Sequence, residues 1–365
     1  IMNIRYPLYE GVYRILTFLD RMMKRTRFFT APSWAVILLL LLSSCNKENA
    51  STESGATGGN GNAVPIGFSS SVASLADTRA GAITDIRYMY VFASYTGTSD
   101  WTAASIPNFM YRQLMEKSPD GTWTYAPTKY WPGNTNEKIS FFAYAPMDVE
   151  GLSLSPGDVA GPKLTYIVPT QESEKQDLLL GSVMNRTSAG GQVSFLMKHA
   201  LAQIRFRVKS GDANATKVLK GLTVHAPGKG IVSFAADGSL EWPSNTIGTP
   251  ATFTADDTFR GGTTVGVPGD TSQATDIIGT FFLLPIGDPS AAGATISLDF
   301  TLQKTSDPVP VELTATSLFP ASQEWTAGST VTYTLTLVDD RLEFGTISVE
   351  GFGGGTSSGS DIPAT

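Results

Sequence analysis

The feature that most constrains the fold of this chain is a two-residue alternation of apolar and polar side chains. Successive side chains of a β-strand point to opposite faces, so each alternating run predicts a strand with one buried face. Ile204, Phe206 and Val208, for example, alternate with Arg205 and Arg207, which predicts a half-buried strand with a basic outer face. Other strand-like runs are residues 66–72, 88–95, 139–145, 296–302 and 331–337.

Glycine and proline are frequent, with 36 and 21 of the 365 residues, and no segment shows a long helical stripe. Many short strands joined by turns of this composition are typical of antiparallel β-sandwiches. The length suits two domains, and a small polar stretch at residues 210–215 follows a strong strand. We therefore expect an all-β chain with two antiparallel β-sandwich domains in series, residues 63–210 and 211–350, and a flexible tail at 351–365.

The first 44 residues have the features of an export leader. A basic cluster that includes Lys24 and Arg25 precedes an unbroken apolar run at residues 34–42, and small residues follow it. This order is that of a secretory signal peptide, and the run is too short to cross a bilayer as a helix. Translation from Met22 or Met23 would give a signal peptide of ordinary length. Residues 1–21 would then be an artefact of the assigned gene start.

Cys45 is the single cysteine of the chain. It cannot form an internal disulfide, and with only two histidines it cannot complete a Cys/His metal cluster. Residues 42–45, Leu-Ser-Ser-Cys, resemble the bacterial lipobox, in which the signal peptidase cuts before a diacylated cysteine. We expect lipidation at Cys45, followed by a flexible linker over residues 45–62. A free buried cysteine is the weaker alternative, because polar residues follow at once.

Nothing in the sequence indicates an enzyme, a cofactor or a metal site. The net charge of −7 argues against a nucleic-acid partner. His199 and His225 lack metal-ligand spacing, and we expect His199 to be a satisfied structural histidine. The acidic pairs 256–257 and 339–340 are adjacent residues that point to opposite faces of a strand, whereas a surface hydrolase would need two facing carboxylates.

Aromatic residues leave two interpretations open. Trp123 and Trp131 lie in an aromatic segment, residues 123–132, and more often such side chains fill the core of an all-β domain. Alternatively, Trp101, Trp123 and Trp131 form an exposed platform on which sugar rings stack. That interpretation describes a surface glycan- or host-ligand-binding lipoprotein, and it requires all three side chains to be exposed on one face.

Several motifs, taken in order, resemble those of the fimbrillin-like (Mfa-like) family of Bacteroidales lipoproteins. They span most of the chain after the linker and are Ile66-Gly67-Phe68, Thr78-Arg79-Ala80 and residues 121–132, 139–146, 176–179, 198–204 and 325–335. The resemblance implies two transthyretin-like β-sandwiches and no enzymatic activity. It also implies a lipoprotein of the outer membrane, exposed at the cell surface, that becomes a subunit of an adhesive type V pilus.

The resemblance further implies assembly by strand exchange. In the family, an arginine-specific, gingipain-type protease removes the lipidated N-terminus together with the first strand, and a strand from another subunit fills the vacated groove. Here the cut would fall between Arg79 and Ala80. The displaced strand would be residues 66–72, with Ile66, Phe68 and Val72 as its buried side chains.

The candidate donor strand lies near the C-terminus and carries Phe344, Ile347, Val349 and Phe352. Its alternation changes phase between Phe344 and Ile347, so one half of it is open to being an ordinary strand of its own domain. We expect that deleting residues 341–365 blocks polymerisation and leaves the monomer folded. The family also contains anchor and tip subunits, and the sequence does not separate these from the stalk.

Overall fold

The computed structural model describes residues 63–73, 83–321 and 323–351. All of them fall within one unit, residues 59–365. This part of the chain consists of strands, loops and short 3₁₀ helices without an α-helix, which confirms the all-β prediction. Its short 3₁₀ helices are Glu172–Glu174, Ser188–Gly190, Ser244–Thr246 and Arg260–Gly262. None of these short helices could span a membrane.

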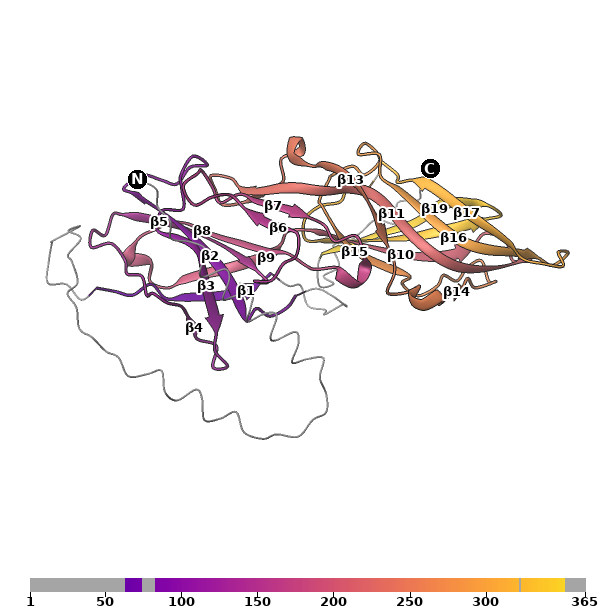
Figure 1. The fold of residues 1–365 in the computed structure, drawn as a ribbon, viewed down its shortest axis with the longest axis horizontal. Coiled ribbons are helices and arrows are strands. Elements are labelled where there is room, and N and C mark those ends of the chain that lie inside the picture. Colours follow the sequence, from indigo (N-terminus) through magenta and orange to yellow (C-terminus); the bar gives the residue numbers. More distant parts are fainter. Residues whose placement is uncertain (1–62, 74–82, 322, 352–365) are drawn as a thin grey trace, which may run out of the picture. The chain divides into compact units, whose positions relative to one another are not determined.

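A seven-stranded sheet forms the N-terminal half of the described residues (Figure 1). Its order is β1-β9-β8-β5-β2-β3-β4, and only the pair of β1 with β9 is parallel. The strands are β1 (Phe68–Val72), β2 (Tyr88–Gly97), β3 (Met110–Lys117), β4 (Trp123–Thr124), β5 (Lys138–Ala145), β8 (Leu179–Arg186) and β9 (Val193–His199).

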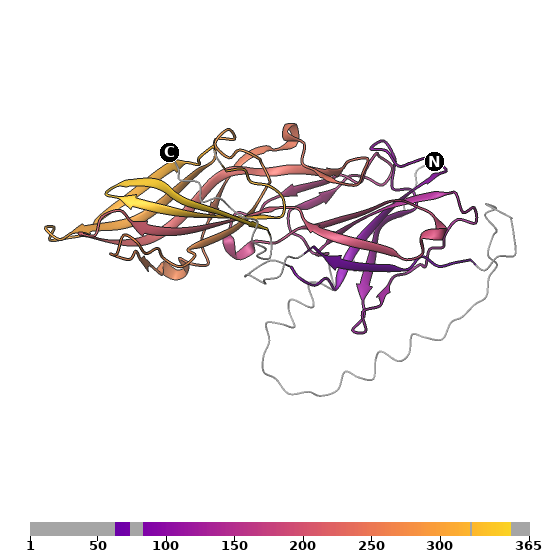
Figure 2. The same ribbon diagram turned by 180° about the vertical axis from the view of Figure 1, so that it is seen from behind.

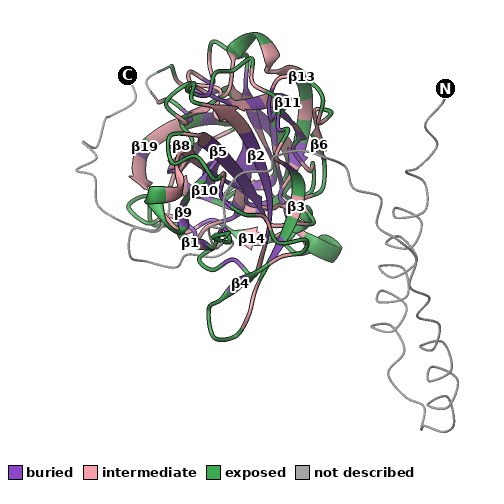
Figure 3. Cartoon of the chain, turned by 90° about the vertical axis from the view of Figure 1, so that its left-hand side faces the viewer, coloured by how far each residue is buried: buried purple, intermediate pink, exposed green. Residues whose placement is uncertain are grey.

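This sheet curls so that its first and last strands meet. β1 and β4 stand at opposite ends of the strand order yet contact each other, and Pro65, just before β1, bridges to Tyr130. The curl encloses a core of its own, the N-terminal core, which includes Met89, Phe141, Phe195 and Trp131. The central strands β2 and β5 are buried on both faces, as their nearly unbroken apolar runs require (Figure 3).

An eight-stranded sheet is organised around β11 (Ala215–Phe234). Along this long strand buried residues alternate with exposed or half-buried ones, with a change of phase at the β-bulge between Leu219 and Gly221. Its partners change from β16 at its start to β7 and β12 at its end. The other strands are β6 (Leu152–Leu154), β7 (Leu164–Ile167), β12 (Leu240–Glu241), β13 (Gly248–Thr254), β14 (Val265–Gly266), β16 (Thr295–Lys304) and β17 (Val311–Leu318).

The third sheet has four strands in the order β15-β10-β18-β19. These are β10 (Ala202–Ser210), β15 (Gly279–Leu283), β18 (Ser329–Val338) and β19 (Arg341–Gly351). The part of the chain that forms its last two strands is coloured yellow in Figure 2. Ile204, Phe206 and Val208 of β10 are buried, and they join side chains of β11 and β16 in a second, larger core. The apolar side chains of this alternating run therefore face the core, as predicted.

The domain boundary expected at residue 210 stays a prediction. β10 ends at Ser210 and pairs with β15 and β18, which come from the C-terminal half. β7, from the N-terminal half, pairs in turn with β11. Hydrogen-bonded pairing therefore passes across residue 210 in both directions.

Candidate functional site

The first strand is held in the seven-stranded sheet along one edge only. β1 pairs in parallel with β9, in a register that runs from Phe68 opposite Val193 to Val72 opposite Met197. The peptide N–H of Ala73 donates to the carbonyl of Met197 at 2.7 Å, which extends the ladder by one residue. β1 is thus an edge strand, attached to the sheet through β9.

Just before β1, the backbone turns to a second partner near β4. The N–H of Ile66 donates to the carbonyl of Lys129 at 2.9 Å, and the N–H of Trp131 donates to the carbonyl of Val64 at 3.0 Å. The Tyr125 hydroxyl also donates to the carbonyl of Ile66 at 2.8 Å. Residues 64–72 therefore connect β9 to the segment after β4 and close the curled sheet.

The side chains of this strand fill the N-terminal core. Ile66 and Phe68 are buried, and Phe68 is only 2% exposed. The Phe68 ring centroid lies 5.3 Å from that of Tyr125, 5.7 Å from that of Phe141 and 6.2 Å from that of Phe195. Val72 is half-buried at the other end of the strand. Removing the strand would leave an apolar groove lined by these rings.

The candidate cleavage site, Arg79 and Ala80, lies outside the described residues, as does the candidate lipidation site, Cys45. Both described flanks of the cleavage segment are anchored. Ala73 donates to β9 before it, and after it the N–H of Ile83 donates to Oδ2 of Asp177 at 3.1 Å. The backbone is therefore fixed on either side of residues 74–82.

Asp177 and His199 form a buried pair that is not evident from the sequence. Nδ1 of His199 lies 2.7 Å from the same Asp177 oxygen that accepts the Ile83 N–H. His199 is thus a structural histidine with a polar partner, as expected. Both residues lie in motifs of the resemblance, at 176–179 and 198–204, but their contact spans 22 positions and leaves no local signal.

The candidate donor strand is β19, and it is paired in its own sheet. It lies at the edge beside β18, with Leu342 and Ile347 buried and Val349 half-buried, while Phe352 lies outside the described residues. The change of phase after Phe344 corresponds to a β-bulge in the ladder. Of the strand's two halves, both are therefore integrated in this sheet.

Phe344 also contacts two aromatic rings of the larger core. Its ring centroid lies 5.4 Å from that of Phe319 and 5.5 Å from that of Tyr333. Deleting residues 341–365 would thus remove core contacts as well as a donor. The expectation that such a truncation leaves the monomer folded stays a prediction. The loss of the Phe344 contacts would lower the stability of the truncated monomer.

The three tryptophans of the alternative interpretation do not form a platform. Trp123 and Trp131 are buried in the N-terminal core, and Trp101 is buried in the larger core, where its ring centroid lies 5.0 Å from that of Phe142. Since they belong to two different cores, these side chains are not displayed together on one face. The observation favours the core role over sugar stacking.

The acidic pairs are engaged in local surface contacts. Asp256 accepts the Ser173 hydroxyl at 2.6 Å, and Asp257 lies 2.7 Å from Arg260. Lys304 lies 2.7 Å from Asp339, and this hydrogen bond lowers the pKa of the Asp339 carboxyl. Within the described ranges, no group of three His, Cys, Asp or Glu side chains is placed to hold a metal ion.

Comparison with known proteins places the chain in a family. Solved structures similar to it include candidate cell adhesion proteins from Bacteroides uniformis (15% identity, 79% of this chain and 99% of that one, TM-score 0.47) and Bacteroides eggerthii (14%, 81% and 98%, 0.47). The fimbrial anchor protein Mfa2 from Porphyromonas gingivalis is also similar (11%, 79% and 98%, TM-score 0.34). No curated protein sequence matches.

The family model described as fimbrillin-like matches residues 78–351, more than half of the chain, and confirms the resemblance found in the sequence. The chain belongs to the fimbrillin-like family.

Proposed function

We propose that this protein is a structural subunit of a cell-surface fimbria, assembled by strand exchange after cleavage at Arg79. The observation that carries the proposal is the position of Phe68: a buried aromatic side chain on an edge strand whose sheet closes around it. Membership of the fimbrillin-like family supports a location at the cell surface and a role in adhesion. We also propose that its two sandwiches are transthyretin-like.

Removing β1 would create a strong demand for a replacement strand. The edge of β9 would lose its backbone partners, and each buried polar group left unpaired costs about 1–3 kcal/mol. The groove would also expose the rings that now surround Phe68. A strand from another subunit with alternating apolar side chains would satisfy both needs by β-augmentation.

The order of segments along the chain makes cleavage an assembly signal. Cys45 and residues 66–72 both precede Arg79, so one cut would separate the folded domains from the lipid and from β1 together. The partners are then an outer-membrane lipid before cleavage, an arginine-specific surface protease, and other fimbrial subunits afterwards.

β19 is the donor that we propose, and the structure gives donation a definite cost. The strand would have to leave β18 and withdraw Leu342 and Ile347 from the core. Fully burying such a side chain contributes about 1.5–3 kcal/mol, so donation is favourable only if the acceptor groove buries the strand again. Because donation depends on an open acceptor groove, β19 would stay paired with β18 in an uncleaved monomer.

The test is proteolysis of the purified chain with an arginine-specific protease, followed by N-terminal sequencing and electron microscopy. We expect a new N-terminus at Ala80 and the appearance of fibres. Arg79→Ala should abolish both, whereas the matched variant Arg87→Ala, at an exposed arginine of the next segment, should abolish neither. Resistance at Arg79 with cleavage elsewhere, or fibres formed by Arg79→Ala, would contradict the proposal.

A further inference from the structure

A pocket of about 340 Å³ lies beside the hairpin of β8 and β9, and the turn between β11 and β12 forms its other wall. Its volume is in the lower part of the range that small-molecule sites occupy, roughly 300–1,000 Å³. The side chains that matter here are three leucines, a serine and two opposite charges: Leu180, Leu196, Leu240, Ser182, Lys198 and Asp237. Phe195 and Met197 of β9 lie in the N-terminal core, on the other face of the strand, so the pocket is separate from the groove around β1.

The register of β8 with β9 explains why a pocket forms here. The two strands pair at only two positions, and the ladder ends with Leu180 opposite Lys198. Toward their connecting loop the strands diverge (Figure 1). Ser182 and Leu196 are the next side chains on the same face, and the register does not pair them. Leu196 is therefore 51% exposed and gives the pocket an accessible apolar surface beside the buried Leu180.

The turn between β11 and β12 is fixed against β8. The Ser182 hydroxyl donates to the carbonyl of Gly238 at 2.6 Å. Gly238 has a φ of +85°, and a Cβ at this position would collide with the Ser182 hydroxyl, so the close approach requires glycine. Next to it, Oδ1 of Asp237 accepts the N–H and the hydroxyl of Ser239 at 2.8 and 2.7 Å. The carboxylate is thus oriented by the turn, and its Oδ2 has no hydrogen-bond partner among the described residues.

The two charges of the pocket are available to a ligand. Lys198 and Asp237 are both exposed, they come from different elements, and neither forms an ion pair within the described residues. The hydrogen bonds from Ser239 lower the pKa of the Asp237 carboxyl, and the charge of Lys198 adds to this effect. Asp237 is therefore ionised at neutral pH, and an ammonium and a carboxylate border the same apolar surface.

We propose that this pocket binds a free α-amino acid with an aliphatic side chain. The α-carboxylate of the ligand pairs with the ammonium of Lys198, and its α-ammonium group donates to Oδ2 of Asp237. Hydrogen bonds between two charged groups are shorter and stronger than neutral ones. The aliphatic side chain lies against Leu196 and Leu240, which removes apolar surface of both partners from water.

The pairing of opposite charges favours a zwitterion over other small ligands. A simple carboxylate would leave Asp237 without a partner, and a simple amine would leave Lys198 without one. A residue inside a peptide carries neither main-chain charge. Glycine has both charges but leaves the leucine side chains of the pocket in contact with water. A free aliphatic amino acid is the smallest ligand that meets all three requirements.

Binding at this pocket is independent of the function proposed above. Its lining comes from β8, β9 and the chain around the β11–β12 turn, so neither cleavage at Arg79 nor movement of β19 is needed to form it. The measurement therefore uses the uncleaved full chain as a monomer. Arg79→Ala, which should block cleavage and assembly, should bind the ligand as the unmodified chain does, and loss of binding in this variant would contradict the separation of the two sites.

The experiment is saturation-transfer NMR together with isothermal titration. The probes are leucine, isoleucine and valine. The controls are N-acetylleucine, which lacks the ammonium group, leucinamide, which lacks the carboxylate, and glycine, which lacks the side chain. We expect saturable binding of at least one of the three probes, with each control at least about tenfold weaker, as expected when a hydrogen bond between charged groups is lost. Absence of saturable binding by all three probes, or equal binding of any control, would overturn the proposal.

A pair of aspartate variants connects binding to the pocket. Asp237→Asn keeps an acceptor for Ser239 and removes the charge, so it should preserve the turn and weaken binding about tenfold or more. Asp270→Asn is the matched control, because Oδ1 of Asp270 accepts the N–H and the hydroxyl of Ser272 at 2.9 and 2.7 Å in a similar turn that does not line the pocket. Equal weakening by both variants would show that the effect is not local and would overturn the site.

A pair of lysine variants tests the other charge. Lys198→Met removes the ammonium group and keeps an apolar chain of similar length, so it should also weaken binding about tenfold or more. Lys229→Met is its control, at an exposed lysine of β11 that does not line the pocket. Thermal unfolding of each variant is measured beside binding. Unchanged binding in a folded Lys198→Met protein would contradict the assignment of the carboxylate partner.

Discussion

Phe68→Ala tests whether the β1 side chain inside the curled seven-stranded sheet stabilises the N-terminal core. The side chain is 2% exposed and packs against three aromatic rings, of Tyr125, Phe141 and Phe195. Truncating a buried Phe to Ala typically costs 3–5 kcal/mol, through lost burial and the cavity that remains. Aromatic pairs contribute about 0.5–1.5 kcal/mol each beyond the area that they bury. We therefore expect Phe68→Ala to lower the free energy of unfolding by about 4–5 kcal/mol, in the upper part of the range for such substitutions.

The assay is urea denaturation of the full chain, followed by tryptophan fluorescence and circular dichroism. Two neighbours provide controls: Val72→Ala, at a half-buried position, should cost about 1 kcal/mol, and Ser71→Ala, at an exposed position, should stay within about 0.5 kcal/mol. A loss below about 1 kcal/mol for Phe68→Ala, equal to that of Val72→Ala, would refute the reasoning, because the groove would then depend little on its main side chain.

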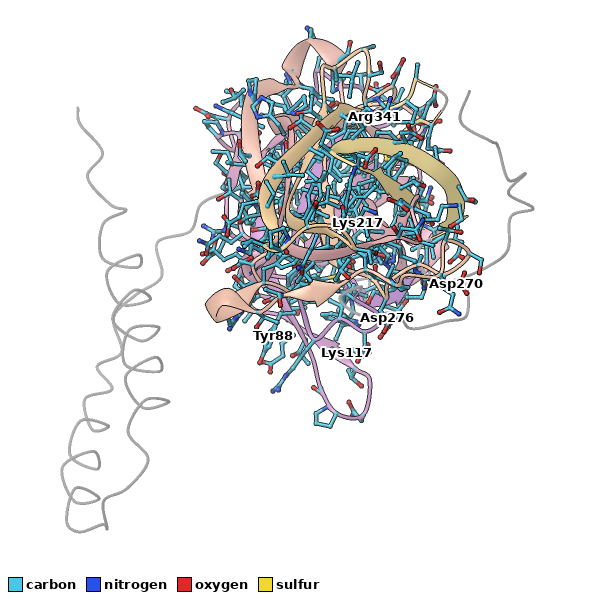
Figure 4. All side chains as sticks on the ribbon, turned by 90° about the vertical axis from the view of Figure 1, so that its right-hand side faces the viewer. Tyr88, Lys117, Lys217, Asp270, Asp276 and Arg341 are labelled. Atoms are coloured by element: carbon cyan, nitrogen blue, oxygen red, sulfur yellow. The ribbon has the colours of Figure 1, made fainter. Side chains whose placement is uncertain are left out.

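Three further variants probe the fold around the site. Lys217 is buried (Figure 4), and burial lowers the pKa of its ammonium group. Between its pKa in the folded chain and its higher pKa in the unfolded chain, the unfolded chain binds more protons, so the stability of the fold should rise with pH. Lys217→Met should flatten this rise in thermal melts between pH 7 and about pH 10, and an unchanged slope would contradict the argument. Gly345→Ala would place a Cβ 2.8 Å from the Thr334 carbonyl oxygen in the β19 bulge, so we expect a loss of about 1–3 kcal/mol in urea denaturation, and a loss near zero would mean that the bulge is easily deformed. Asp177→Ala removes the acceptor of the Ile83 N–H, so exchange of this amide should accelerate in hydrogen-exchange NMR, whereas unchanged protection would show that another group holds this backbone.

The strands themselves could be predicted because their signal is local. The alternation of Ile204, Phe206 and Val208 is a property of neighbouring residues, and the structure places these side chains in a core. The same pattern predicted a basic outer face, and Arg207 is exposed on that face, whereas Arg205 is largely buried. Arg205 lies opposite Thr280 of β15 and Thr332 of β18, which come from distant parts of the chain, and no short window of sequence contains that information.

The way strands pair could not be predicted for the same reason. β1 lies in parallel with β9, with Phe68 opposite Val193, across a separation that only the folded sheet defines. The meeting of β1 with β4 and the contact of Asp177 with His199 are likewise long-range. The apolar side chains of the first strand could be named in advance, whereas the curled sheet that makes a groove around them could not.

The central claim is that the groove left by β1 accepts a strand from another copy, and a competing peptide tests it most directly. Chain cleaved at Arg79 is allowed to polymerise in the presence of a large excess of a synthetic peptide of residues 63–73, with light scattering and electron microscopy as the measurements. The account predicts that the peptide blocks polymerisation and that the same peptide carrying Phe68→Asp does not, because a carboxylate cannot enter the apolar core. Polymerisation that proceeds equally fast with and without the unmodified peptide would contradict it.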